Sequence, residues 1–118
     1  MDIKNNFKKG SVEMILLSLL STQDLYGYEM AQLIVEYGNG YITVPEGSLY
    51  PTLYRLEDRH YISSYKKLVG KRMKRIYYHI EDEGRDYLEE LIKEYYAVNN
   101  CITGIIQHAL RKDVTDEQ

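Results

Sequence analysis

Four basic side chains fall within five consecutive positions of this 118-residue chain: Lys71, Arg72, Lys74 and Arg75. Ammonium and guanidinium groups bind phosphate oxygens, and a cluster of this density suits a polyanion whose condensed counterions it can displace. The only nearby glycine, Gly70, lies in the same short stretch and favours a turn. These residue types therefore predict a basic turn that binds phosphate groups.

A second set of polar side chains lies about twenty residues earlier, on a predicted helix over residues 48–59. Leu49, Leu53 and Leu56 form its buried stripe, which leaves a polar outward face. The helix is expected to begin between Glu46 and Ser48, with Ser48 as its N-cap and Pro51 tolerated in the first turn. The outward face then carries Ser48, Pro51, Tyr54, Arg55 and Arg59. Free N–H groups at this helix start suit a phosphate, and arginine is the usual side chain that reads guanine.

Other kinds of chemistry find little support. The three histidines, His60, His79 and His108, lack metal-ligand spacing, and the single cysteine, Cys101, excludes a disulfide framework or a cysteine-based zinc module. No set of nucleophile, base and orienting residue is visible, and no glycine-rich phosphate loop. We therefore expect no enzyme, no metal and no cofactor.

The net charge of −3 and the pI of about 5.6 conceal a division of charge along the chain. Residues 55–80 hold eight basic and two acidic side chains, whereas residues 1–54 and 81–118 carry balances of −3 and −6. A basic block between two acidic ones is a candidate contact with nucleic acid. No apolar run is long enough to span a membrane, and the polar first nine residues lack a signal-peptide core, so we expect a soluble, cytoplasmic protein.

The order of the predicted elements defines the fold class. Apolar periodicity predicts helices over residues 11–21, 26–38 and 48–59, two strands over 62–68 and 75–80, and a long helix over 82–110. This order is that of a winged helix-turn-helix, mainly α with a small β-hairpin, followed by a long C-terminal dimerisation helix. We expect a DNA-binding domain over residues 1–80 and a dimerisation helix with its tail over 81–118.

The long helix carries two heptad series of apolar residues, which predict a coiled-coil-like seam with a second chain. The expected dimer interface comprises Leu88, Leu91, Tyr95, Val98, Ile102 and Ile105. The first helix has its main apolar stripe on one side and Met14 and Leu17 on roughly the opposite side, so it too is expected to pack against two partners.

Two stretches resemble the signatures of the PadR family of bacterial transcriptional regulators. They are Leu25-Tyr26-Gly27-Tyr28-Glu29 and the run from Pro45 to Glu57, PEGSLYPTLYRLE. The pair Tyr77-Tyr78, followed by Gly84-Arg85, is similar to the family's junction between hairpin and last helix. The single C-terminal helix resembles the short subfamily.

The resemblance implies a homodimeric repressor that binds palindromic double-stranded operator DNA and is released by a small molecule. The expected DNA-binding residues are Lys8, Lys9, Tyr26, Ser48, Tyr50, Pro51, Tyr54, Arg55, Lys71, Arg72, Lys74 and Arg75. A planar aromatic effector between the subunits would contact Met14, Leu17, Leu88, Leu91, Tyr95 and Asn99.

Several alternatives stay open at this point. Tyr50, Tyr54 and Tyr65 can equally pack around the junction of helix and hairpin, and Asn99 can fix the register between two helices. Tyr95 stands where some drug-binding short members carry a tryptophan. The rival function is a winged-helix adaptor that binds proteins without specific DNA binding.

Overall fold

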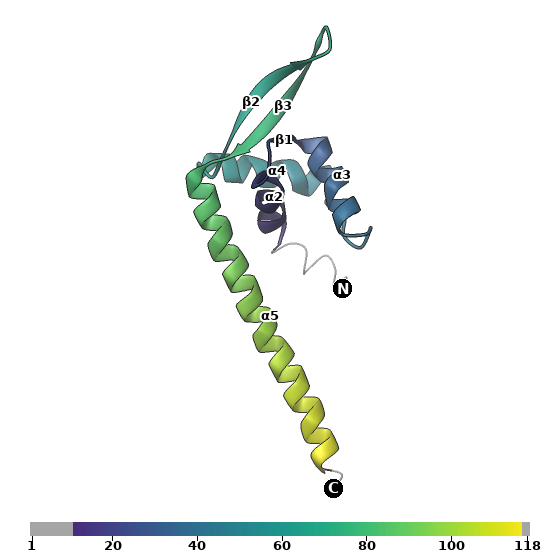
Figure 1. Cartoon of the computed structure of the whole chain (residues 1–118). Coiled ribbons are helices and arrows are strands. Elements are labelled where there is room, and N and C mark those ends of the chain that lie inside the picture. The colour runs from purple at the N-terminus through teal and green to yellow at the C-terminus, as the bar shows by residue number, and fades with distance from the viewer. Residues whose placement is uncertain (1–10, 117–118) are drawn as a thin grey trace. The chain divides into compact units, whose positions relative to one another are not determined.

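The computed structural model describes the backbone of residues 11–116 and the side chains of residues 11–111. The described helices are α2 (Val12–Leu20), α3 (Gly27–Tyr37), α4 (Glu46–Asp58) and α5 (Asp82–Asp116), and the strands are β1 (Leu25–Tyr26), β2 (Ile62–Val69) and β3 (Met73–Ile80) (Figure 1). The predicted fold, a winged helix-turn-helix followed by a long helix, is confirmed. None of the helices among the described residues is long and apolar enough to cross a membrane.

One compact unit ends at Leu88, and a second begins at Glu89. The first unit, called the head below, contains the three shorter helices, the sheet and the first two turns of α5. The predicted functional boundary, with a DNA-binding domain over residues 1–80 and a dimerisation helix over 81–118, is not tested by this division into compact units and stays a prediction.

Leucines from three helices and from strand β1 form much of the core of the head. Leu16, Leu17, Leu20, Leu53 and Leu56 are at most 1% exposed. Leu17, which the sequence places on a second apolar face of the first helix, is therefore covered within this chain and needs no second subunit to bury it. A helix with apolar residues all round its circumference gives no indication of which side the core covers, and here α2 turns Leu17 inward together with Leu16 and Leu20.

The sheet is antiparallel, with the order β1-β3-β2. The hairpin pairs Ile62 with Ile80 at its base and Val69 with Met73 at its tip, so both strands run further toward the turn than expected. Gly70 takes a φ of 71°, a left-handed conformation that suits glycine in this tight turn. Strand β1 was not predicted; it pairs Leu25 with Tyr78 on the other side of β3.

The first turns of α5 are held against the rest of the head by close packing and hydrogen bonds. The backbone N–H of Glu81 donates to the Tyr61 carbonyl at 2.9 Å, and Gly84 lies against the same carbonyl. The Arg85 guanidinium donates to the Ser21 carbonyl at 3.1 Å. A side chain at position 84 would collide with this backbone, which explains why glycine is required there.

Two tyrosines add a second fastening at the same place. The rings of Tyr61 and Tyr87 stack with centroids 4.3 Å apart, and the Tyr87 hydroxyl donates to a Glu13 carboxylate oxygen at 2.7 Å. Burial, followed by this hydrogen bond and the Glu13 charge, raises the pKa of Tyr87 to about 12. Tyr87 therefore stays a neutral donor over the whole physiological range.

The second unit contains the rest of α5, which ends at Asp116 rather than at the predicted Leu110. Its side chains are mostly exposed over the described residues. Five large aliphatic residues among the described part of this unit are about half exposed or more: Val98, Ile102, Ile105, Ile106 and Leu110. Val98, Ile102 and Ile105 belong to the predicted heptad series, so these seam positions have no cover within this chain segment.

Candidate nucleic-acid interface

Helix α4 begins at Glu46, with Pro45 as its N-cap residue and no side-chain cap. The helix start lies within the predicted interval, but the assignment of Ser48 as N-cap is wrong. Ser48 is the third helical residue, and its N–H donates to the Pro45 carbonyl at 2.9 Å. Proline at the cap position supplies the extended backbone that begins the helix, which leaves the exposed Ser48 hydroxyl free of a capping role.

Pro51 is the sixth residue of α4 and therefore lies beyond the first turn, contrary to expectation. At this position a proline ring ordinarily meets the carbonyl four residues earlier. That residue is Gly47, which is exposed and has no neighbouring side chain within 4 Å of a hypothetical Cβ. The helix nevertheless continues unbroken through Pro51 to Asp58.

The exposed face of α4 is the predicted one. Ser48, Pro51, Tyr54 and Arg55 are exposed, whereas Leu49, Thr52, Leu53 and Leu56 are buried. Arg55 donates through its guanidinium to Thr52 Oγ1 at 3.1 Å, and Thr52 Oγ1 donates to the Ser48 carbonyl at 2.7 Å. This chain of hydrogen bonds restricts the arginine and presents its remaining donors outward.

The β2–β3 hairpin, called the wing below, carries its cations along both strands as well as at the tip. Lys71, Arg72 and Lys74 are exposed as expected. Sequence reasoning did not assign Lys66 and Lys67 to the site, although both are exposed on β2. The available signal was a pair of adjacent lysines within a predicted strand.

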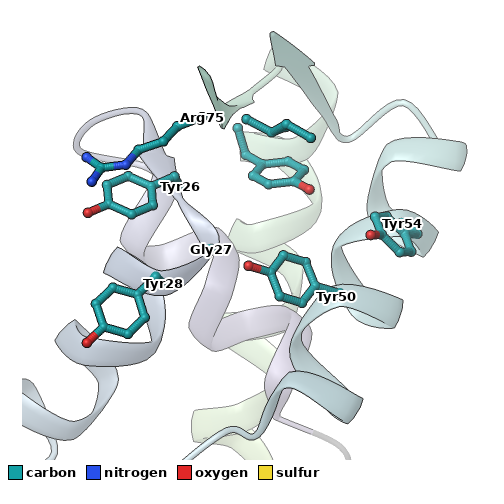
Figure 2. A pocket seen from close by; sticks show the side chains of 8 residues that line it. Tyr26, Gly27, Tyr28, Tyr50, Tyr54 and Arg75 are labelled. Atoms are coloured by element: carbon teal, nitrogen blue, oxygen red, sulfur yellow. The ribbon is translucent and has the colours of Figure 1, made fainter. Parts of the chain in front are cut away.

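Arg75 and Lys67 differ from the other described wing cations because each lies against an aromatic ring. The Arg75 guanidinium carbon lies 4.4 Å from the centroid of Tyr26, a cation–π contact that fixes both side chains (Figure 2). Directly across the hairpin, the Lys67 ammonium lies 5.3 Å from the centroid of Tyr77. The wing therefore presents two cations on aromatic supports.

A hollow of about 220 Å³ lies between the start of α3, the helix α4 and strand β3 (Figure 2). Its lining is mostly tyrosine: Tyr26, Gly27, Tyr28, Tyr50, Tyr54, Arg75, Ile76 and Tyr78. Burial raises the pKa of Tyr78 to about 12, with smaller contributions from nearby Tyr54 and Glu57. Burial and the charge of Glu46 also raise the pKa of Tyr50. Both phenols are neutral at physiological pH, so Arg75 supplies the charge of this lining.

Gly27 is the residue that lets α3 and α4 approach each other at this hollow. A Cβ at position 27 would collide with the Tyr50 hydroxyl and lie 2.7 Å from its Cζ. The Tyr50 ring therefore occupies the space that a side chain would need. Of the two readings left open for Tyr50, packing is realised in the structure, and a contact with nucleic acid stays a prediction.

Comparison with known proteins gives the family. The sequence profile of the "Transcriptional regulator PadR-like family" matches residues 16–90, more than half of the chain. This chain is a member of the PadR-like family. The resemblance inferred from the two tyrosine-rich stretches is thereby confirmed.

Relatives of similar length support the assignment. An uncharacterized protein from Lysinibacillus sphaericus is 35% identical over 100 residues, which cover 85% of this chain and 92% of the relative. A transcriptional regulator from Clostridium thermocellum has a structure with a TM-score of 0.78 and 34% identity, covering 83% of this chain and 95% of that one. A PadR-like regulator from Bacillus cereus gives a TM-score of 0.74 at 32% identity, covering 86% and 97% of the two chains.

A further structure shares the fold at lower identity. Bacillus subtilis PadR, crystallised with operator DNA, gives a TM-score of 0.63 at 22% identity and covers 68% of this chain but 45% of its own. The regulator YqjI of Escherichia coli is 30% identical over 84 residues, and the match spans 39% of its length. These longer proteins contain regions that this PadR-like chain does not match.

The remaining predicted site residues lie in different surroundings. Lys8 and Lys9 fall outside the described residues. Leu17 and Leu88 are buried in the head at 0% and 7% exposure, which removes them from any open effector surface in this structure. Partly exposed positions are Met14 on α2 and Leu91, Tyr95 and Asn99 on α5. Tyr95 meets the edge of Tyr96, with ring centroids 5.2 Å apart.

Proposed function

We propose that this PadR-like protein regulates transcription by binding DNA with α4 and the wing. The observation that carries the proposal is the placement of an exposed polar helix face and a strongly basic hairpin in one compact unit. Helix α4 is suited to the major groove, where side chains on its first turns reach base edges. The wing cations are suited to the adjoining phosphates.

Helix α4 and the wing are expected to contribute differently to DNA binding. Arg55, oriented by Thr52, has free donors for a guanine edge and would contribute to sequence preference. Lys71 and Arg72 lie at the exposed tip and would contribute affinity for any sequence. Bacillus subtilis PadR, which shares this fold, was crystallised with operator DNA and supports the same mode of use.

We further propose a homodimer formed through the second unit. The exposed apolar positions of α5, among them Val98, Ile102 and Ile105, form a seam that a second copy would cover. A two-fold axis between two copies would place the recognition helices one helical turn of DNA apart, roughly 34 Å, and would require a palindromic operator.

Repression and release by a small molecule complete the proposal. A planar aromatic effector at the subunit interface would use the partly exposed Met14, Leu91, Tyr95 and Asn99. Tyr95 offers a ring for stacking in place of the tryptophan that some short members carry. An effector that binds one arrangement of the two heads better than the other would shift the dimer away from DNA.

Selection of bound DNA from a random pool tests the function directly, because it reports both the preferred sequence and the half-site spacing. With the selected site, Lys71→Ala and Arg72→Ala should weaken binding to all sequences and reduce the salt slope by about 1 per lost phosphate contact. Arg55→Ala should instead reduce the preference for the selected site over other sequences.

Lys93→Ala is the matched control, since Lys93 is exposed on the second unit and pairs with Glu89 on the same helix. Lys93→Ala should leave unchanged both the salt-dependent affinity for DNA and the preference for the selected site. If the wild-type protein shows no salt-dependent DNA binding at low ionic strength, the proposal is wrong and the adaptor function is favoured.

A further inference from the structure

Asp24 is an acidic residue at the base of a basic surface. It directly precedes β1, and its side chain is 34% exposed. A carboxylate at this position opposes the approach of a polyanion by simple charge repulsion. If the surface binds a polyanion, Asp24 must therefore favour binding in another way that outweighs this repulsion.

The Asp24 carboxylate binds both strands of the wing. Oδ2 accepts a hydrogen bond from the Tyr65 hydroxyl on β2 at 2.7 Å, and Oδ1 lies 2.8 Å from Nδ1 of His79 on β3. Burial alone would raise the pKa of Asp24, but the hydrogen bonds from Tyr65 and His79 and the charge of His79 hold it below its usual value. The carboxylate is therefore ionised and shared between the two strands.

A continuous set of ring contacts leads from this carboxylate to two wing cations. The Tyr65 ring stacks on Tyr77 with centroids 5.8 Å apart and planes 15° apart. Tyr77 lies beneath the Lys67 ammonium and meets Tyr26 edge-on at 5.5 Å. Tyr26 in turn supports the Arg75 guanidinium. Strand pairing places these groups together, because Tyr65 faces Tyr77 and Lys67 faces Arg75 across the hairpin.

We propose that Asp24 is a positioning residue, which through Tyr65 and Tyr77 holds Lys67 and Arg75 where DNA phosphates are contacted. This role rests on the proposed DNA binding. Long basic side chains lose conformational entropy when they bind, and a cation already seated on an aromatic ring loses less. Asp24 thus increases the attraction for DNA in spite of its own negative charge.

The sign of the effect separates positioning from plain electrostatics. If Asp24 acted only through its charge, Asp24→Ala would bind DNA more tightly, because a negative charge near the phosphates is removed. If it positions the wing cations, Asp24→Ala should bind more weakly, and its salt slope should fall by about 1 to 2 per head as two phosphate contacts loosen. Asp24→Asn keeps one acceptor oxygen for Tyr65 and should restore part of the slope.

Titration of the selected DNA site against salt, with full-length protein, is the decisive experiment. Asp86→Ala is the matched control, since Asp86 is an exposed acid on the first turns of α5. Asp24→Ala and Lys67→Ala should also be non-additive in a double-mutant cycle, because the first removes the support of the second.

Three results would count against the proposal in distinguishable ways. Wild-type protein that fails to bind DNA overturns the proposed function and this role with it. Wild-type protein that binds, together with an Asp24→Ala variant of equal or greater affinity and slope, overturns the positioning role alone. Strict additivity with Lys67→Ala overturns the route through Tyr65 and Tyr77.

Discussion

Gly84 provides the most direct test of how the head holds the first turns of α5. An alanine at this position would place its Cβ 2.9 Å from the Tyr61 carbonyl carbon, closer still to its oxygen, and 3.0 Å from Ile80 Cγ1. The obstacle is backbone, which itself accepts the hydrogen bond from Glu81 and is not free to move. Overpacking of this kind costs about 1–3 kcal/mol.

The expected magnitude follows from two opposing contributions. Steric strain at a backbone carbonyl belongs at the upper end of that range, whereas alanine regains up to about 1 kcal/mol of helix propensity. We expect Gly84→Ala to lower the free energy of unfolding by about 2 kcal/mol and the melting temperature by roughly 10 °C. Thermal and urea unfolding at fixed protein concentration would measure both, because a dimer's stability depends on concentration.

The same helix contains the control. Gly104 is exposed on α5, and nothing lies within 4 Å of a hypothetical Cβ there. Gly104→Ala should therefore stabilise the protein by about 0.5–1 kcal/mol. If the two variants differ by less than about 0.5 kcal/mol, the collision with Tyr61 does not control this junction and the reasoning is refuted.

Three other predictions concern the tyrosines and α5. Tyr87 has a pKa raised to about 12 from an ordinary 10.0, so its contribution to stability is complete below pH 10 and is lost as the pH rises through 12. Tyr87→Phe should therefore reduce the loss of stability between pH 10 and pH 12. An alkaline unfolding curve that is the same for the variant and the wild type would contradict this. Gly27→Ala should cost less stability than Gly84→Ala, because the Tyr50 ring can swing aside, and the Tyr50 ring resonances in NMR spectra should shift. Ile102→Asp combined with Ile105→Asp should yield monomers in sedimentation experiments, with Asn100→Asp as the control, whereas dimers of the double variant would exclude this seam.

The sequence was informative wherever the signal is local. Apolar periodicity located all four described helices, and the alternation of residues around Ile76, Tyr78 and Ile80 located the second strand of the wing. The exposed face of α4 followed from the spacing of three leucines. These features depend on residues within a few positions of each other, which is the range over which a pattern is visible.

Features that depend on distant partners were missed. Strand β1 has two residues and exists because Leu25 and Tyr26 pair with Tyr78 and Tyr77, about fifty positions away. The contact of Asp24 with Tyr65 and His79 has the same origin, since no local pattern relates these residues. Ser48 was misplaced because serine is the more common cap, whereas here the extended backbone of Pro45 begins the helix.

The sheet order gives the wing cations a further consequence that concerns solubility. Strand β2 is an edge strand, and β3 pairs with β1 only at Tyr77 and Tyr78, so much of the wing presents unpaired backbone groups within the described residues. Leu68, Met73 and Ile76 are exposed on these strands. Such an edge invites strand-to-strand aggregation, and lysines along it are a common protection. The same charges therefore oppose strand-to-strand pairing of the free protein, and we expect a variant that lacks several of them at once to aggregate before any change in DNA binding can be measured.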